Sequence, residues 1–353
     1  MTISSRFLGQ SGRSFATGRR TTRREPNPMR GRIVETGSAL PTRVLSNDDL
    51  ARMVATSDEW IRERTGIQER RIVADGIASS DLGTEAAQVA LARAGWDPAS
   101  LDLIVVATCT ADMPLPSTAC LIQRNLKASR AFAFDLAAAC SGFLYGLSVA
   151  DLYVRSGMCR RVLLVGTEVM SAIMDWTDRS TCILFGDGAA AVLIEPCDDD
   201  RGILSTHLHS DGNLWDLVCV EGGGSRIPPS LKMLENRQHL LKMKGNETFK
   251  VAVKTLEATA REALAENHLD VKDVDLFIPH QANVRILNAV AERLGLEPER
   301  LVINIERYGN TSAASIPLAL DEAVQDGRVK PGSRILMAAF GSGLTWASAL
   351  VKW

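Results

Sequence analysis

Three features are missing from this 353-residue sequence, and each absence narrows what the protein does. No stretch approaches eighteen apolar residues without a charge, so no segment is expected to span a membrane. The net charge is only −2, so the chain lacks the overall positive charge that is typical of nucleic-acid-binding proteins. None of the seven cysteines forms a CxxC pair and no secretory signal is found, so we expect a reduced, cytoplasmic chain.

Residues 1–28 differ in composition from the rest of the chain. They carry six arginines and one acidic residue, and their apolar residues follow no helix or strand period. We expect a basic, disordered extension, with Met29 as an alternative start of the working chain. An Arg-rich, acid-poor composition is also typical of transit peptides, which would direct the protein to an organelle stroma instead.

The remaining sequence repeats itself weakly. Residues 83–109 and 251–281 both have the pattern of an amphipathic helix, a turn and a buried strand. Identical charged residues recur at the same interval of 173 positions: Asp102 matches Asp275, and Arg161 matches Arg334. The duplication predicts two similar halves, 29–200 and 201–353, packed about a pseudo-twofold axis.

The alternation of helices with fully apolar strands predicts an α/β fold. Strands that are apolar on both faces indicate mostly parallel sheets covered by helices on both sides. Each half ends in a strand pair joined by a glycine turn, FGDGAAAVLIEP and FGSGLTWASALVKW. The first half contains an extra segment near residues 170–185, before its version of this pair.

The stretch FDLAAACSGFLYGL, residues 134–147, places Cys140 among small residues where an apolar run turns into a helix. The positive end of a helix dipole favours a thiolate, and small neighbours leave room for a substrate carbonyl. We therefore expect Cys140 to be a nucleophile. The alternative is a cysteine that only fills space, since free cysteine is among the most buried residue types.

Two other polar residues follow predicted strands. His280 comes after a buried strand ending at Ile278, and Asn310 lies in a turn after a strand ending near Ile305. Ligands of layered α/β folds collect at the carboxyl ends of strands, so both residues are expected to share a site with Cys140. Each alone also fits a structural role, a satisfied buried histidine and a turn or N-cap asparagine.

Two further motifs are not expected to carry chemistry. EGGGSR at residues 221–226 is not followed by GK[ST], so it is not a phosphate loop. His207 and His209 share one face of a strand, but no ligand set of matching spacing accompanies them, so no metal site is expected.

Residues 29–353 resemble the family of β-ketoacyl-acyl carrier protein synthase III. The resemblance rests on TSDEWIRERTGI, DLAAACSGFLYGLSVADLYVRSG, FGDGAAAV, HLHSDG, GNETFKVAV, PHQANVRI and GNTSAASIPLALDEA. It implies a thiolase-like, five-layered αβαβα fold and an acyltransferase that initiates fatty acid synthesis. Such an enzyme condenses an acyl-CoA with malonyl-acyl carrier protein, giving 3-ketoacyl-acyl carrier protein, CoA and CO₂, without a metal or other cofactor.

The resemblance also implies a role for individual residues. The family's catalytic triad maps to Cys140, His280 and Asn310, with an acyl-cysteine intermediate, and the backbone N–H groups of Cys140 and Ser342 would hold the oxyanions. The residues implied in CoA binding are Trp60, Arg64, Arg179, Gly245, Asn246 and Phe249, with the adenine stacked between Trp60 and Arg179. Lys250 and Arg285 would form a basic patch for the acidic acyl carrier protein, and a homodimer is expected.

Two departures from the family pattern bear on the acyl chain. Leu115 stands where many short-chain members have phenylalanine at the end of the acyl pocket, contributed across the dimer interface, so we expect longer or branched primers. Residues 215–241 form a longer segment that either reshapes the mouth of the channel or is a tolerated surface loop. Two alternatives remain: a paralogue with the same triad in secondary metabolism, and a non-catalytic partner subunit.

Overall fold

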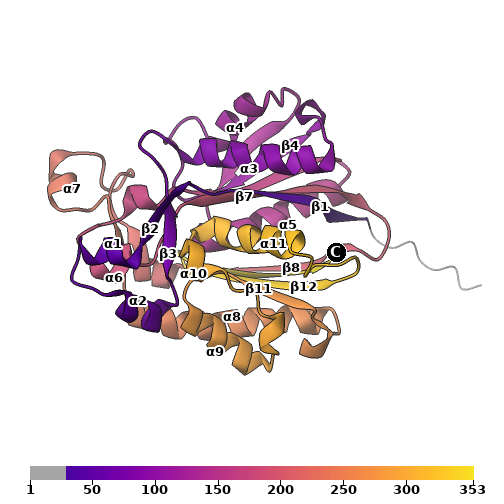
Figure 1. The fold of residues 1–353 in the computed structure, drawn as a ribbon. Coiled ribbons are helices and arrows are strands. Elements are labelled where there is room, and N and C mark those ends of the chain that lie inside the picture. The colour runs from indigo at the N-terminus through magenta and orange to yellow at the C-terminus, as the bar shows by residue number, and fades with distance from the viewer. Residues whose placement is uncertain (1–28) are drawn as a thin grey trace, which may run out of the picture.

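The computed structural model describes residues 29–353, which fold into five layers (Figure 1). Helices form the two outer layers and the middle layer, and a sheet lies on each side of the middle layer. The helix layers are α3 (Ser79–Ala94) with α4 (Thr118–Leu126), α5 (Gly142–Arg155) with α11 (Ser315–Gln325), and α8 (Gly245–Glu266) with α9 (Val284–Leu294). The predicted five-layered αβαβα fold is confirmed, while the extension predicted for residues 1–28 lies outside the described residues.

Two sheets hold the layers together. The first has the order β1-β7-β6-β4-β5, with β1 at Arg30–Ala39, β7 at Gly188–Cys197, β6 at Val162–Glu168, β4 at Leu103–Ala107 and β5 at Phe132–Leu136. The second has the order β11-β12-β13-β8, with β11 at Leu276–Pro279, β12 at Arg334–Gly341, β13 at Thr345–Lys352 and β8 at Gly202–Ser210. Every residue of β4, β6 and β11 is buried, because helices cover both faces of each sheet.

Smaller elements surround one end of the sheets. They are the paired strands β2 (Arg43–Ser46) and β3 (Glu69–Ile72), the paired strands β9 (Val218–Val220) and β10 (Leu241–Met243), and the helices α1 (Asn47–Ala51), α2 (Asp58–Thr65), α6 (Arg179–Cys182), α7 (Leu231–Glu235) and α10 (Ile305–Tyr308). No helix within residues 29–353 is long and apolar enough to span a bilayer.

The two halves repeat at the level of single hydrogen bonds. The backbone N–H of Asp102 donates to the carbonyl of Arg161 over 2.9 Å, and that of Asp275 donates to the carbonyl of Arg334 over 2.9 Å. In each half this bond precedes a parallel strand pair, β4 with β6 and β11 with β12. The interval of 173 residues therefore reflects a structural duplication. The boundary between the halves at residue 200 stays a prediction.

The prediction of mostly parallel sheets is confirmed for strand direction, with one reversed strand in each sheet. In the first sheet β7 runs antiparallel to both β1 and β6, and in the second β13 runs antiparallel to both β12 and β8. In the second half a short turn after Gly341 leads the chain from β12 into β13, so the new strand returns alongside the previous one. Full burial of these strands follows from the helix layers and not from parallel pairing.

The strand predicted to end near Ile305 is also absent. Ile305 begins the short helix α10, and only a single bridge joins Leu301 to Phe277 of β11. The side chain of Gln281 replaces the backbone hydrogen bonds that a neighbouring strand would make. Its Nε2 donates to Val302 O over 3.1 Å, and its Oε1 accepts from Asn304 N over 3.0 Å. A side-chain amide thus satisfies backbone groups that a longer strand would have paired.

Candidate active site

A cavity of about 470 Å³ opens between the two halves at the carboxyl ends of β5 and β11. Cys140, His280 and Asn310 all line it. They come from the turn before α5, the residue after β11 and the loop after α10, so three separate segments bring them together. Other predicted residues in the wall are Trp60, Arg64, Gly245, Phe249 and Ser342.

Cys140 lies in a 3₁₀ turn, η2 (Ala139–Ser141), directly before α5. Ala139 has a left-handed φ of +44°, a conformation that costs about 1–2 kcal/mol for a residue with a Cβ. Gly341 makes room for this turn, since a Cβ there would lie 2.7 Å from the backbone nitrogen of Cys140. The glycine of the FGSG turn therefore lets the second half pass close to the cysteine.

The thiol of Cys140 is protonated in the free protein. Burial raises its pKa to about 12; the hydroxyl of Ser312 opposes this shift, and the carboxylate of Glu168 adds to it. This differs from the thiolate expected from the helix dipole alone, because desolvation of the charged form outweighs the dipole. A nucleophilic role for Cys140 would therefore require a base that takes the proton of the thiol.

His280 presents a neutral imidazole to the same cavity. Burial lowers the pKa of its ring to about 3, so the imidazole carries no charge near neutral pH. Its Nδ1 lies 2.7 Å from Oγ of Ser315, which leaves Nε2 for the cavity. A neutral imidazole accepts a proton at Nε2 in one tautomer and donates a hydrogen bond from Nε2 in the other.

Asn310 is held at both its backbone and its side chain. Its N–H donates to Leu184 O over 2.8 Å, and its carbonyl accepts from Gly186 N over 3.1 Å. Its side-chain Oδ1 accepts from the backbone N–H of Ser312 over 2.8 Å. With Oδ1 engaged, the amide donor Nδ2 is the group that Asn310 offers to a ligand in the cavity.

Ser342 lies in the turn between β12 and β13, at the cavity wall. Its side-chain hydroxyl turns away to donate to Val218 O. The turn is tied to the cysteine loop, because Thr345 Oγ1 donates to Ala138 O over 2.9 Å and Ser141 Oγ donates to Thr345 O over 3.0 Å. These bonds hold the backbone of Ser342 beside the turn that carries Cys140.

Trp60 lies at the rim of the cavity between arginines. The guanidinium carbons of Arg64 and Arg179 each lie 4.5 Å from the centre of its ring. Arg179 does not line the cavity itself, and it is held by a 2.7 Å hydrogen bond to Ala55 O. An adenine that stacks between Trp60 and Arg179 would have to displace this guanidinium from the ring.

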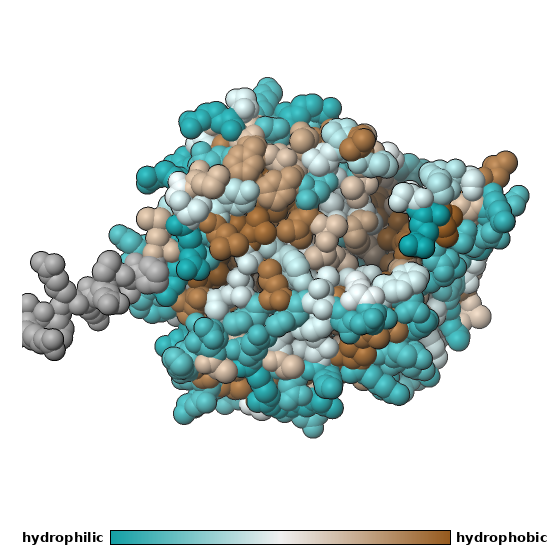
Figure 2. All heavy atoms as spheres, turned by 180° about the vertical axis from the view of Figure 1, so that it is seen from behind, coloured by the Kyte–Doolittle hydropathy of each residue, from teal (hydrophilic) through white to brown (hydrophobic). Residues whose placement is uncertain are grey.

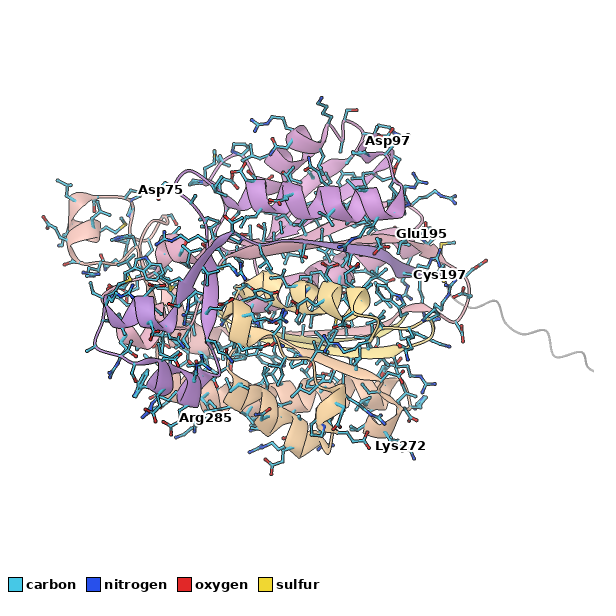
Figure 3. All side chains as sticks on the ribbon, in the orientation of Figure 1. Asp75, Asp97, Glu195, Cys197, Lys272 and Arg285 are labelled. Atoms are coloured by element: carbon cyan, nitrogen blue, oxygen red, sulfur yellow. The ribbon has the colours of Figure 1, made fainter. Side chains whose placement is uncertain are left out.

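The other residues expected to bind substrates divide into two groups. Gly245 and Phe249 line the cavity, whereas Asn246, Lys250 and Arg285 do not. Arg285 is exposed at the molecular edge beside α2, with its guanidinium carbon 5.7 Å from the ring centre of Phe249 (Figure 3). Arg285 and the exposed Lys250, which follows Phe249 in α8, therefore both lie close to the cavity wall.

Leu115 lies outside the cavity. Its side chain is 85% exposed, so one chain alone does not place it at an acyl pocket. The longer segment 215–241 has two parts: β9 and β10 contribute Val218 and Leu241 to the cavity wall, and α7 between them projects from the body (Figure 1). This segment therefore shapes the cavity as well as the surface.

His207 and His209 share a partner that their spacing did not indicate. Glu262 of α8 lies 2.7 Å from Nε2 of His209 and 3.6 Å from Nδ1 of His207. Within residues 29–353, no group of three such side chains has an arrangement that could hold a metal ion.

Sequence reasoning missed three residues at this site. Cys109 and Ser312 line the cavity, with Cys109 Sγ 3.7 Å from Ser312 Oγ, and the buried Glu168 binds both. One signal was present in the sequence: Glu168 ends the otherwise uncharged strand VLLVGTE, and a carboxylate buried at that point needs hydrogen-bond donors.

Comparisons with known proteins point to a single family. Two family models match, "3-Oxoacyl-[acyl-carrier-protein (ACP)] synthase III" at residues 134–212 and its "C terminal" model at residues 264–353. Proteins named beta-ketoacyl-[acyl-carrier-protein] synthase III are similar. The one from Xanthomonas campestris is 54% identical, covering 91% of this chain and 98% of that protein, and the one from Roseiflexus castenholzii is 51% identical, covering 90% and 96%.

A solved structure extends the likeness to the whole fold. The crystal structure of 3-oxoacyl-[acyl-carrier-protein] synthase III from Aquifex aeolicus is 47% identical, covers 92% of this chain and 100% of that chain, and superposes with a TM-score of 0.86. Identity at this level, over nearly the full length of each relative, means that the chain belongs to the β-ketoacyl-acyl carrier protein synthase III family of condensing enzymes.

Proposed function

We propose that this chain condenses an acyl-CoA with malonyl-acyl carrier protein to give 3-ketoacyl-acyl carrier protein, CoA and CO₂. The observation that carries the proposal is the convergence of Cys140, His280 and Asn310 on one cavity. A nucleophile, a neutral base and an amide donor are the groups that this reaction requires. The presence of all three weighs against a non-catalytic partner subunit, and the relatives' names do not favour a specialised paralogue.

In the first half-reaction Cys140 takes the acyl group from CoA. His280 accepts the thiol proton as sulfur attacks the thioester carbonyl, and the tetrahedral oxyanion is held by the backbone N–H groups of Cys140 and Ser342. The C–S bond to CoA then breaks, and CoA leaves with the proton. One thioester replaces another, so the exchange is nearly balanced in free energy and needs no metal or redox cofactor.

In the second half-reaction malonyl-acyl carrier protein loses CO₂. The electron pair of the broken C–C bond becomes an enolate, whose oxygen needs hydrogen-bond donors. A neutral His280 and Nδ2 of Asn310 can both donate, and neither carries an acidic proton that would quench the carbanion. The enolate carbon then attacks the acyl-Cys140 carbonyl, the C–S bond breaks, and the sulfur leaves as a thiolate that takes up one proton from solvent to restore the thiol.

The substrates enter from the side of Trp60 and Phe249. The adenine of CoA stacks on Trp60 after displacing the guanidinium of Arg179 from the ring, and Arg64 stays beside it. The pantetheine arm passes Asn246 at the mouth and then follows Gly245 and Phe249 to the cysteine. Lys250 and Arg285 at the same mouth are suited to an acidic carrier protein, although the chain as a whole has a net charge of only −2.

We further propose a homodimer formed along β5, the edge strand of the first sheet. Phe132 on this strand is 44% exposed and Leu115 nearby in sequence is 85% exposed, while an edge strand offers unpaired backbone groups. Figure 2 shows apolar residues gathered on the face turned away from the viewer in Figure 1. Such a dimer would bring Leu115 of each copy to the other's acyl pocket.

A cytoplasmic location is part of the proposal. All seven cysteines are free thiols, including the buried ones, which suits a reducing compartment. If residues 1–28 act as a transit peptide, an organelle stroma would be the location instead.

Intact-protein mass spectrometry tests the proposed activity. The enzyme is mixed with acyl-CoAs from acetyl to dodecanoyl and with isobutyryl-CoA, without malonyl-acyl carrier protein, so that the acyl-enzyme accumulates. We expect one acyl adduct, mapped to Cys140 and absent from Cys140→Ser. An absence of any adduct with every acyl-CoA would refute the catalytic proposal and bring forward the partner-subunit alternative.

A further inference from the structure

Glu168 is a buried carboxylate with no part in the half-reactions described above. It is the last residue of β6 and has no exposed surface. Within residues 29–353 no lysine or arginine forms an ion pair with it, and neutral donors surround both oxygens. A charged group that is buried at this cost of desolvation requires a structural or functional reason.

The carboxylate joins the two halves of the molecule at the cavity wall. On the side of the first half it accepts from the backbone N–H groups of Cys109 and Thr110, each over 3.1 Å. On the side of the second half it accepts from Ser312 Oγ over 3.0 Å and from Ala313 N over 3.4 Å. Every partner donates, so the ionised form of Glu168 fits the site and a neutral acid or amide would present a donor to a donor.

Ser312 needs this support because its backbone is strained. Its φ of +48° lies in the left-handed region that non-glycine residues rarely adopt. Glu168 fixes this turn because its Oε1 accepts hydrogen bonds from two consecutive residues, from Ser312 Oγ and from the backbone N–H of Ala313. The same turn presents the N–H of Ser312 that holds Oδ1 of Asn310 over 2.8 Å. Glu168 is therefore two hydrogen bonds away from the amide that faces the cavity.

We propose that Glu168 is a positioning residue for the condensation half-reaction. Its carboxylate holds the Ser312 turn, the turn orients the Asn310 amide, and the amide stabilises the enolate formed from malonyl-acyl carrier protein. This inference rests on the proposed function. Acyl transfer to Cys140 uses backbone N–H groups and His280, and it meets this turn only at the Ser312 hydroxyl, which lowers the pKa of the Cys140 thiol.

The variant Glu168→Gln tests the proposal, because it keeps the shape of the side chain and replaces one acceptor oxygen by a donor. Two reactions are measured separately in the purified full chain: acyl-Cys140 formation by rapid-quench mass spectrometry, and CO₂ release from malonyl-acyl carrier protein. We expect CO₂ release to fall about 10- to 100-fold, as for a misplaced catalytic group, and acylation to change less than about 3-fold.

A matched control removes a buried carboxylate elsewhere. Asp321 in α11 is 2% exposed and accepts from Thr36 Oγ1, Ser38 Oγ and Arg93 Nη1, away from the cavity. Asp321→Asn should lower the free energy of unfolding without separating the two half-reactions. Ser312→Ala removes one of the bonds to Glu168 with little change of volume and should also lower CO₂ release, more weakly than Glu168→Gln. Because the Ser312 hydroxyl also lowers the pKa of the Cys140 thiol, acylation should fall in this variant too, by a smaller factor than CO₂ release.

The charge of Glu168 provides a readout that a merely structural role would not change. The titratable groups near Cys140 are Glu168, the thiol of Cys109 and the neutral ring of His280. In Glu168→Gln the negative charge is lost, so the pH profile of Cys140 alkylation should move to lower pH even as CO₂ release falls.

The measurements distinguish a failure of the positioning role of Glu168 from a failure of the proposed function. If both half-reactions fall together, or neither changes in Glu168→Gln and Ser312→Ala, Glu168 is not a positioning residue for condensation. If Glu168→Gln does not fold, Ser312→Ala decides between these results. If the unmodified enzyme forms no acyl-Cys140 at all, the proposed function itself fails, and that result is independent of the variants.

Discussion

The backbone N–H of Ser312 donates to the side-chain Oδ1 of Asn310 over 2.8 Å. This one bond decides which end of the amide faces the cavity, because an occupied oxygen leaves the NH₂ group for a ligand. The orientation matters for a negatively charged intermediate, which a donor stabilises and an acceptor repels. Several tests of the site follow from this asymmetry and from the protonation states around it.

Asn310→Asp should be worse than Asn310→Ala in condensation. Aspartate keeps the bond to Ser312 N, but its second oxygen places negative charge where the enolate oxygen forms. We expect CO₂ release from malonyl-acyl carrier protein to fall by about 10²–10³ in the alanine variant and further in the aspartate variant. Acylation of Cys140 serves as the internal control. Aspartate activity equal to that of asparagine would contradict the assignment of Nδ2 as the donor.

Alkylation of Cys140 should rise steadily with pH. Since burial raises the pKa of this thiol to about 12, the thiolate fraction grows about tenfold per pH unit throughout the neutral and mildly alkaline range. Iodoacetamide labelling, mapped by peptide mass spectrometry between about pH 7 and pH 9, measures the slope. The Cys140→Ser protein reports background labelling at other cysteines. A plateau below about pH 9 would mean that the helix N-terminus outweighs burial.

Trp60→Ala and Arg179→Ala should weaken the binding of acyl-CoA without affecting the chemistry. Each removes one face of the proposed adenine stack, worth about 0.5–2 kcal/mol, so KM should rise about 3- to 30-fold with little change in kcat. Acyl-N-acetylcysteamine, a thioester without the nucleotide, is the matched control substrate. Equal losses with both thioesters would show that these residues support the fold and do not bind adenine.

Leu115→Phe should shift primer choice toward acetyl-CoA if Leu115 enters the acyl pocket of a second subunit. Contacts of about one methylene in an apolar pocket are worth roughly 1–3 kcal/mol, so the ratio of acetyl to octanoyl transfer should rise about 10-fold or more. Competition between two acyl-CoAs, read as adduct masses on Cys140, measures this ratio. Sedimentation at micromolar concentration checks the dimer independently. An unchanged ratio in a dimeric protein would place the pocket elsewhere.

Much of the architecture was predictable because it follows from local pattern. Apolar residues a few positions apart predict the helix and buried strand that end near Ala107. The same pattern predicts their repeat, which ends near Pro279. The 173-residue register between Asp102 and Asp275 added the duplication. Strand direction was less accessible, since β7 and β13 gain their antiparallel partners only when the chain returns on itself.

The candidate site, like the fold, has some features that are predictable from the sequence and others that depend on the folded structure. The amino-acid sequence fixes which side chains are present, and the motifs around Cys140, His280 and Asn310 are enough to identify the family and its chemistry. The protonation of those groups depends on the folded structure, because desolvation in a cavity lined by both halves raises the pKa of Cys140 and lowers that of His280. The tertiary structure alone brought Glu168 to Ser312, 144 residues away, since a buried carboxylate recruits its donors through space and leaves no spacing in the sequence that reveals them.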